Sequence, residues 1–284
     1  MFTSILVPLD ASSESVIAVS PARTLAMTLG AEIALIRVVA TSDARLSVLN
    51  SADLDLAHDD LEEVEVVVSL GDEADTIVAE AQSHGADLIV MSTQARRLAR
   101  QVLAHSRVPV MLVRGQDHQM ERLRLILVPV DGSTGSLVAL GTASRLARAA
   151  RAAVVLLRVV VPLPLWIYDP TLGLNTGPLI DPRWDEDRRE NAEAYVRRVA
   201  QKLTDSGIET GADAVLGEVA PAIAEYADQQ AVDLIVMSTH ARFGPTNALL
   251  GSVADQVVDT TRLPVLLLSR ESVGMLDGGK PRRQ

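Results

Sequence analysis

Two short stretches of this sequence decide its fold, because each of them occurs twice. Residues 5–10 read ILVPLD, and residues 126–131, 121 positions later, read ILVPVD. The block DLIVMST at residues 87–93 recurs unchanged at residues 233–239. Since both blocks recur in the same order, we predict that one α/β unit has been duplicated in the chain.

Each repeat is expected to contain five strands. Apolar runs rich in β-branched residues, without polar alternation, are typical of strands buried on both faces. These runs cover residues 4–8, 33–39, 64–70, 87–91 and 108–113 in the first repeat, and residues 125–130, 154–161, 210–216, 233–237 and 263–268 in the second. Because helical spacing of apolar residues separates the runs, the strands should pair in parallel through right-handed crossovers. We therefore predict an α/β fold of two tandem Rossmann-like domains, each a five-stranded parallel sheet of order 3-2-1-4-5 with helices on both faces.

The chain is long enough for two domains with separate cores, since it has 284 residues. Residues 115–121 are polar and lack a period, which predicts a linker. The expected domains are therefore residues 1–115 and residues 122–270. Residues 271–284 are expected to form a disordered tail.

The two repeats differ between their second and third strands. In the second repeat, residues 162–182 are rich in proline and glycine and predict a long loop, and residues 185–203 predict a helix. The first repeat has only residues 41–63 for the same connection, so we interpret it as the reduced copy. The aromatic residues at 166 and 168 are expected either to pack this loop over the core or to form a lid over a ligand.

Composition excludes several classes of function. A net charge of −11 opposes nucleic-acid binding, which needs cations to neutralise phosphates. Arg96, Arg97 and Arg100 form a short basic run, which we interpret as a solvated helix face. The chain has no cysteine, which excludes disulfides and thiol catalysis, and its five histidines lack metal-site spacing. Because no apolar run approaches roughly 20 residues and no signal-peptide pattern precedes the first strand, we expect a cytoplasmic protein without membrane contact.

The expected binding site lies where the strand order reverses. In a doubly wound sheet, ligands bind in the crevice between the carboxyl ends of strands 1 and 4. In the second repeat these ends are residues 129–133 and 237–241. Gly251 and Ser252 then precede a helical segment, and Ser252 with Asp255 has the spacing of a capping box. The free amides of such a helix start can bind phosphate, although a glycine turn capped by serine is the alternative interpretation.

Asp87 and Asp233 are also conspicuous, because each begins its copy of the repeated block. They precede their strands, so they should lie at the end of the sheet away from the crevice. We interpret them as caps or surface residues.

These residues together resemble the universal stress protein family in its tandem form. The resemblance rests on the strand-Asp-Gly-Ser opening at residues 125–133, the block DLIVMSTH at residues 233–240, the glycine-serine helix start and the ending LPVLLL at residues 263–268. It covers nearly the whole chain. ATP-binding members of the family carry Gly, two residues, Gly, nine residues, then Gly followed by Ser or Thr. This chain keeps that spacing, but Ser238 and Ala241 replace two of the three glycines before Gly251 and Ser252.

The resemblance implies a nucleotide site in the second domain. Asp131 would hold the ribose or adenine side, the backbone near Val160 would face adenine, and the segment after Gly251 would hold the phosphates. The candidate binding residues are Pro129, Val130, Asp131, Val160, Met237, Ser238, His240, Ala241, Arg242, Gly251, Ser252 and Val253. The implied cofactor is ATP with Mg²⁺. The first domain has no glycine-serine pair between Ala95 and Val108, so we expect no phosphate site there.

The leading hypothesis is an ATP-binding regulatory protein of the stress response. The alternative is a nucleotide-independent interaction scaffold, which the loss of two motif glycines favours. An ATP-hydrolysing enzyme ranks last, because the motif offers only His240 and Arg242 and no catalytic motif is present. The fifth strands, residues 108–113 and 263–268, are apolar edges, and in the family such strands pair between protomers. We therefore expect the two repeats to pair within one chain, and a homodimer of the chain is a further expectation.

Overall fold

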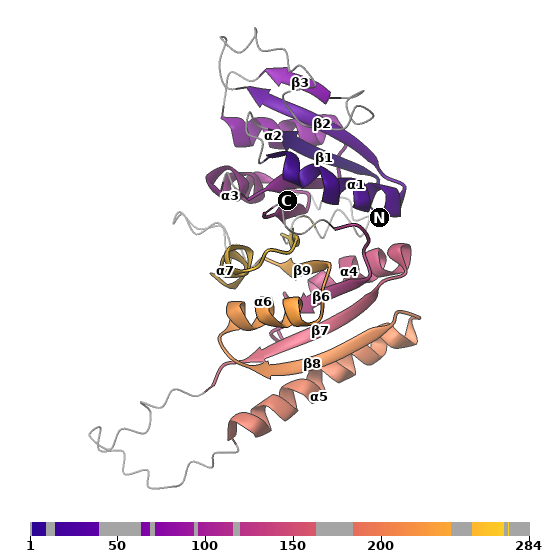
Figure 1. Ribbon diagram of the computed structural model, residues 1–284, viewed down its shortest axis with the longest axis vertical. Coiled ribbons are helices and arrows are strands. Elements are labelled where there is room, and N and C mark those ends of the chain that lie inside the picture. The colour runs from indigo at the N-terminus through magenta and orange to yellow at the C-terminus, as the bar shows by residue number, and fades with distance from the viewer. Residues whose placement is uncertain are drawn as a thin grey trace, which may run out of the picture.

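The computed structural model describes residues 2–9, 15–39, 64–68, 72–93, 96–115, 120–162, 184–239, 252–269 and 272. The predicted tail at 271–284, apart from residue 272, and the predicted loop, apart from residue 162, lie outside these ranges. Figure 1 shows the two halves stacked along the long axis of the molecule.

The ten strands found among the described residues belong to one sheet of order β3-β2-β1-β4-β5-β10-β9-β6-β7-β8. In the first half the strands are β1 (Ser4–Leu9), β2 (Glu32–Val39), β3 (Val64–Val68), β4 (Leu88–Ser92) and β5 (Val110–Val113). In the second half they are β6 (Leu125–Pro129), β7 (Ala153–Val160), β8 (Thr210–Leu216), β9 (Leu234–Ser238) and β10 (Val265–Leu268). Pairing is parallel within each half, and each half has the order 3-2-1-4-5 that the sequence predicts.

In the described part of the chain, seven α-helices connect the strands. They are α1 (Val19–Leu29), α2 (Glu73–Ser83), α3 (Arg96–His105), α4 (Val138–Ala150), α5 (Trp184–Asp205), α6 (Val219–Gln229) and α7 (Ser252–Thr260), and a short 3-10 helix, η1 (Ser15–Ala18), precedes α1. Their ends follow local chemistry. Asp72 caps α2 by accepting from the amides of Ala74 and Asp75, whereas α1 ends at Gly30 in the left-handed conformation. Among the described residues, no helix is both long and apolar enough to span a membrane.

The helices cover both faces of the sheet, which confirms the predicted fold class. One buried cluster packs α1, α4 and α5 against one face, and a second packs α2, α3, α6 and α7 against the other. Each cluster contains residues from both halves, so the two repeats share a continuous core. The predicted linker contributes to it as well, since Met120 is only 1% exposed and its carbonyl accepts from the Thr24 hydroxyl at 2.5 Å.

The two halves are joined by antiparallel pairing of β5 with β10, so the predicted intrachain pairing of the fifth strands is present in the structure. Val110 lies opposite Leu267, Met111 opposite Leu266 and Leu112 opposite Val265. These side chains are at most 2% exposed. Each edge strand therefore covers the apolar edge of the other half.

Asp87 and Asp233 tie the starts of neighbouring strands together. The Asp87 carboxylate accepts from the amides of Thr3 and Ser4, just before and at the start of β1. The Asp233 carboxylate accepts from the amides of Arg124 and Leu125 at 2.7 and 2.8 Å, at the start of β6. Both lie at the amino ends of the strands, as predicted, and each satisfies backbone donors that precede the parallel ladder.

Candidate functional site

A cavity of about 260 Å³ lies in the second half, at the carboxyl ends of β6 and β9. These two strands are neighbours, and the crossovers leave them in opposite directions along the sheet. The cavity therefore occupies the switch point where the sequence places a ligand. Its floor comes from β6, β7 and β9, and its walls come from α6, α7 and the turn that follows β6.

Six of the twelve predicted site residues line this cavity: Pro129, Val130, Asp131, Met237, Ser238 and Val253. They come from three segments that are far apart in sequence. The structure therefore brings together the parts of the prediction that fall on the first and fourth strands and on the helix after them.

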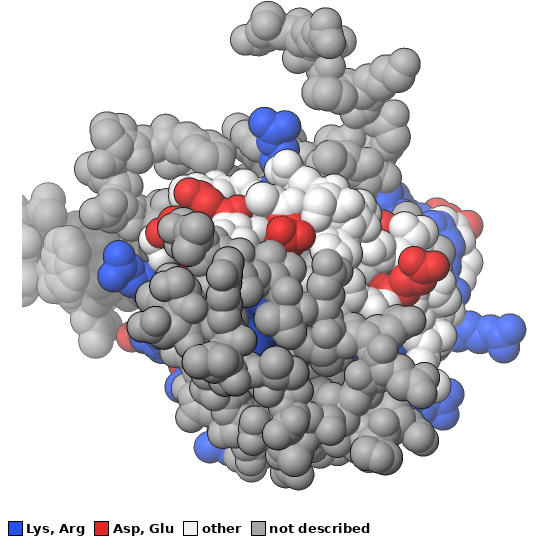
Figure 2. All heavy atoms as spheres, turned by 90° about the horizontal axis from the view of Figure 1, so that it is seen from above, with Lys and Arg blue, Asp and Glu red and all other residues white. Residues whose placement is uncertain are grey.

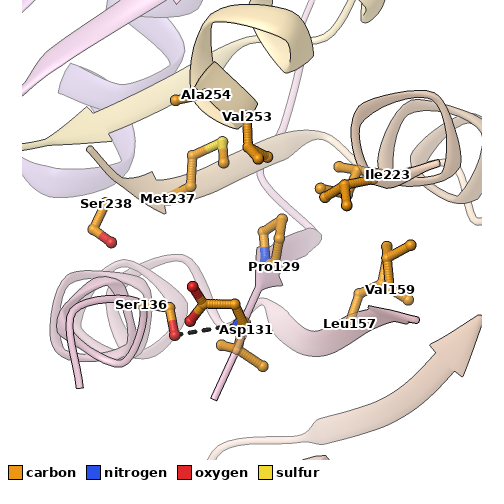
Figure 3. A pocket seen from close by; sticks show the side chains of 12 residues that line it. Pro129, Asp131, Ser136, Leu157, Val159, Ile223, Met237, Ser238, Val253 and Ala254 are labelled. Carbon is orange, nitrogen blue, oxygen red and sulfur yellow. Dashed lines mark hydrogen bonds between the residues drawn. The ribbon is translucent and has the colours of Figure 1, made fainter. Parts of the chain in front are cut away.

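The cavity has a polar end and an apolar end (Figure 3). Asp131, Ser136 and Ser238 lie on one side, and Leu157, Val159 and Ile223 lie on the other. Asp131 is the single charged residue among the described lining residues. The arrangement suits a ligand with an apolar part and a part that donates hydrogen bonds.

Asp131 is held by the turn that follows β6. Its Oδ1 accepts from the Ser133 amide at 2.8 Å, and its own amide donates to Ser136 Oγ at 3.3 Å. Ser136 is buried, and its hydroxyl donates to the Ser133 carbonyl at 2.9 Å. The Asp131 residue itself is exposed, so its carboxylate can accept hydrogen bonds from a ligand.

Gly132 permits the sharp course of this turn. Its φ is +86°, in the region that side chains rarely adopt, and a Cβ there would lie 3.2 Å from Nη1 of Arg158. The Arg158 guanidinium in turn lies over the Tyr195 ring of α5, 5.2 Å from its centroid. Arg158 of β7, which packs on Tyr195 of α5, therefore lies next to the turn that carries Asp131.

Val160 is a candidate through its backbone, and its side chain packs away from the cavity. It is 6% exposed and packs with Ala192 and Ala214 in a separate cluster. Because side chains alternate along a strand, Val159 takes the cavity position instead. The Val160 carbonyl accepts from the amide of Gly217, the residue after β8, at 3.1 Å.

The predicted phosphate-binding segment is only partly described. His240, Ala241, Arg242 and Gly251 lie outside the described residues. Ser252 is the first residue of α7, and Val253 and Ala254 line the cavity in the first turn of that helix. The start of α7 therefore lies at the cavity, as the sequence predicts.

The predicted capping box depends on the Ser252 side chain, which lies outside the part of the chain that the structure describes. Both Asp255 carboxylate oxygens accept from the Arg100 guanidinium of α3. Arg96 and Arg97 are exposed, as the interpretation of a solvated helix face predicts. The sequence did not predict the ion pairs that Arg96 and Arg100 form with Asp259 and Asp255. Among the three, only Arg97 lacks an ion pair with a described residue.

Sequence reasoning missed the other cavity residues, namely Ser136, Leu157, Val159, Val219, Ile223 and Ala254. Leu157 and Val159 could have been found, because alternate residues near the end of a strand beside the switch point share the face of the crevice. The sequence marks Ile223 only as an apolar helix residue. Nothing in the local sequence tells whether such a residue fills a core or lines a cavity.

These observations define the class of protein: two fused doubly wound α/β units, with a cavity at the switch point of the second. The chain belongs to the universal stress protein family, whose model matches residues 1–114 and again residues 123–269. The double match confirms the tandem form that the sequence motifs predict.

Individual relatives agree with this assignment. A universal stress protein of Methanocaldococcus jannaschii is 30% identical over 148 residues, which cover 51% of this chain and 81% of that protein. A universal stress protein structure from Archaeoglobus fulgidus is 17% identical with a TM-score of 0.66, covering 94% of this chain and 96% of that one. A functionally unknown protein from Pseudomonas aeruginosa PAO1 is 20% identical with a TM-score of 0.65, covering 98% and 96%. At these identities the two structures support the tandem fold alone.

Proposed function

We propose that the second domain binds ATP and that the protein acts as a nucleotide-binding regulator in the stress response. The observation that carries this proposal is the cavity between β6 and β9, which has Asp131 at one end, an apolar wall at the other and the start of α7 at its edge. Each of the three parts matches one part of a nucleotide.

The apolar end would take the base. Leu157, Val159 and Ile223 present aliphatic surface, which gains by covering the faces of a flat ring. Asp131 would accept from the ribose hydroxyls, because an ionised carboxylate is an acceptor and those hydroxyls are donors. Ser136 would keep the backbone of Asp131 in place through its hydrogen bond.

The phosphates would lie at the start of α7. The first amides of a helix have no partner within the helix, and the helix dipole favours negative charge there. Gly251, Ser252 and Val253 would provide these amides, with His240, Ala241 and Arg242 alongside. A chain of net charge −11 gains from a cation with the triphosphate, so we propose that ATP binds with Mg²⁺ held by its phosphates.

Binding without efficient turnover is the role that this residue set favours. The one carboxylate among the described lining residues, Asp131, would face the ribose, and it already accepts from Ser133. A group so placed is far from the position of a general base for the terminal phosphate. If the protein has any enzymatic activity, we propose that it is limited to slow hydrolysis of ATP.

A nucleotide-independent scaffold is the second candidate. Ser238 ends β9 and lines the cavity where ATP-binding relatives carry glycine, so its side chain occupies space that a nucleotide would need. Ala241 is the second such replacement. Direct measurement of nucleotide binding separates the two candidates.

We further propose that the protein acts in the cytoplasm without binding nucleic acid or membranes, and that it can form a homodimer. Both acidic and basic side chains occur on the described part of the face in Figure 2, and the net charge of −11 opposes binding of DNA or RNA.

The deciding experiment is to purify the protein under native conditions, denature it and quantify the released nucleotide. We expect near one equivalent of ATP or its products, and an ATP-induced rise in melting temperature for protein emptied of nucleotide. Less than about a tenth of an equivalent, together with no shift in melting temperature, contradicts the proposal. Gly251→Asp should abolish binding by placing a carboxylate at the phosphates, while the fold is retained.

A further inference from the structure

Helix α7 lies in the second half of the chain but contacts residues of both halves. Val253 and Ala254, in its first turn, line the cavity of the second half. Asp255 and Asp259, one and two turns along, bind side chains of the first half. Any movement of α7 relative to the first half therefore changes the wall of the cavity.

Three arginines of the first half hold this helix. Arg100 of α3 binds Asp255 with Nε at 3.0 Å and Nη2 at 2.6 Å from Oδ1, and Nη2 is also 2.6 Å from Oδ2. Arg96 of α3 binds the Asp259 carboxylate at 2.5 Å. Arg114, just after β5, donates to the Asp259 carbonyl near the carboxyl end of α7. Together they fix the helix along its length.

Exposure indicates that these contacts matter more for geometry than for stability. The Arg100 and Asp255 side chains are 39% and 32% exposed, and ion pairs so close to solvent contribute little to folding. A guanidinium that binds both oxygens of a carboxylate nevertheless restricts orientation strongly. Arg97 is the useful contrast, because it lies on the same helix, is exposed, and has no ion pair with any residue that the structure describes.

We propose that Arg100 is a positioning residue for the nucleotide site, acting through Asp255 and assisted by Arg96 and Arg114. The reduced first repeat thus contributes to the site of the second by fixing α7 against the nucleotide. This inference rests on the proposed function. A helix start that binds phosphate must be placed accurately, since small displacements weaken the bonds that its amides make.

The test compares ATP affinity, measured by calorimetry, in Arg100→Ala and in the matched control Arg97→Ala. We expect Arg100→Ala to weaken ATP binding roughly tenfold and Arg97→Ala to leave it unchanged. The swapped pair, Arg100→Asp with Asp255→Arg, should regain most of the affinity, because it restores the contact with the charges exchanged. A merely stabilising contact would not alter affinity in folded protein. Equal affinity in wild type and Arg100→Ala, or an equal loss in Arg97→Ala, overturns the proposal.

A second readout separates this proposal from the proposed function. Hydrogen exchange of the α7 amides in nucleotide-free protein should be faster in Arg100→Ala than in Arg97→Ala. If wild type binds no ATP but the exchange differs as expected, the proposed function has failed, whereas the inference that Arg100 holds α7 in place stands. If exchange is the same in both variants, the inference that Arg100 holds α7 in place is wrong. Arg100→Gln, which keeps most of the side chain, serves in place of Arg100→Ala if the latter does not fold.

Discussion

Arg100 and Asp255 occupy the same position in the two repeats and bind each other. They are 155 residues apart, which is also the separation of Met111 and Leu266, the residues that lie opposite each other at the centre of the β5–β10 pairing. The pair therefore spans the pseudo-twofold axis that relates the halves. In a symmetric pairing of identical repeats, this position would face itself and place like charges together. Because the two charges are opposite, pairing of the first repeat with the second is favoured over pairing of either repeat with another copy of itself.

Reversing one charge should therefore destabilise the junction. Asp255→Arg places two guanidinium groups opposite each other, and we expect the free energy of unfolding to fall by about 1 kcal/mol at low salt. The swapped pair, Arg100→Asp with Asp255→Arg, should recover most of that loss. Urea unfolding at two salt concentrations checks both points, since added salt should reduce the difference. A swapped variant as unstable as Asp255→Arg would contradict this account of the pairing.

The hydrogen bonds between Asp233, just before β9, and the start of β6 predict a larger effect on the free energy of unfolding. Asp233 is buried and accepts from the amides of Arg124 and Leu125, so Asp233→Ala leaves two backbone donors without their acceptor. We expect the free energy of unfolding to fall by about 2–4 kcal/mol. The control is Asp228→Ala, an exposed position on α6, which should change stability by less than about 0.5 kcal/mol. Similar losses in the two variants, measured by urea unfolding, would show that Asp233 is not a structural tie.

Most of the fold could be predicted because its signal is local and occurs twice. The strands are continuous apolar runs, and the repeated blocks place strands 1 and 4 beside each other in both halves. Strands β5 and β10 each begin two residues later than predicted, because residues 108–109 and 263–264 precede the ladder. Strand boundaries depend on which backbone groups find partners, and that is decided by the neighbouring strand.

The site was predictable only where it depends on strand ends. Asp131 and Ser238 follow directly from the strand order, whereas Ile223 lines the cavity because α6 crosses β7 at that point. The pairing of Arg100 with Asp255 could not be predicted, since it depends on how two distant helices meet across the β5–β10 junction. The basic run is largely solvated, as predicted, but the sequence carries no sign that two of its arginines also face acidic residues of the second half.

Two glycines of the second half should respond in opposite ways to substitution by alanine. Gly132 has φ of +86° and a Cβ would lie 3.2 Å from Arg158, so Gly132→Ala should cost about 1–2 kcal/mol and weaken ATP binding by shifting Asp131. Gly141 lies in α4 and is exposed, and a Cβ added there would meet nothing within 4 Å, so Gly141→Ala should stabilise by about 0.5–1 kcal/mol. Thermal unfolding measures both. A stable Gly132→Ala with unchanged affinity would show that the turn does not need this conformation.

A larger side chain at the apolar end of the cavity should prevent the adenine base of ATP from binding there. Ile223 is 1% exposed to solvent and lines the cavity, so Ile223→Trp would extend an indole into the space assigned to adenine. We expect ATP binding to be lost, whereas Ile223→Val, which keeps the space open, should retain it within about threefold. Fluorescence titration with a nucleotide analogue measures both affinities. Retention of full affinity in Ile223→Trp would show that the base lies elsewhere, even if the phosphates lie at α7.

Tyr226 should make stability depend on alkaline pH. Burial of the phenol on α6, followed by repulsion from and hydrogen bonding with Asp213, raises the pKa of Tyr226 to about 12. An unfolded tyrosine ionises near pH 10, so between about pH 10 and 12 the unfolded state loses this proton while the folded state keeps it. The stabilisation is therefore complete below about pH 10 and is lost as the pH rises through about 12. In Tyr226→Phe this decline should be shallower, which urea unfolding between about pH 9 and 11 can measure, with phenolate absorbance as the direct titration. An equally steep decline in Tyr226→Phe would assign it to another group.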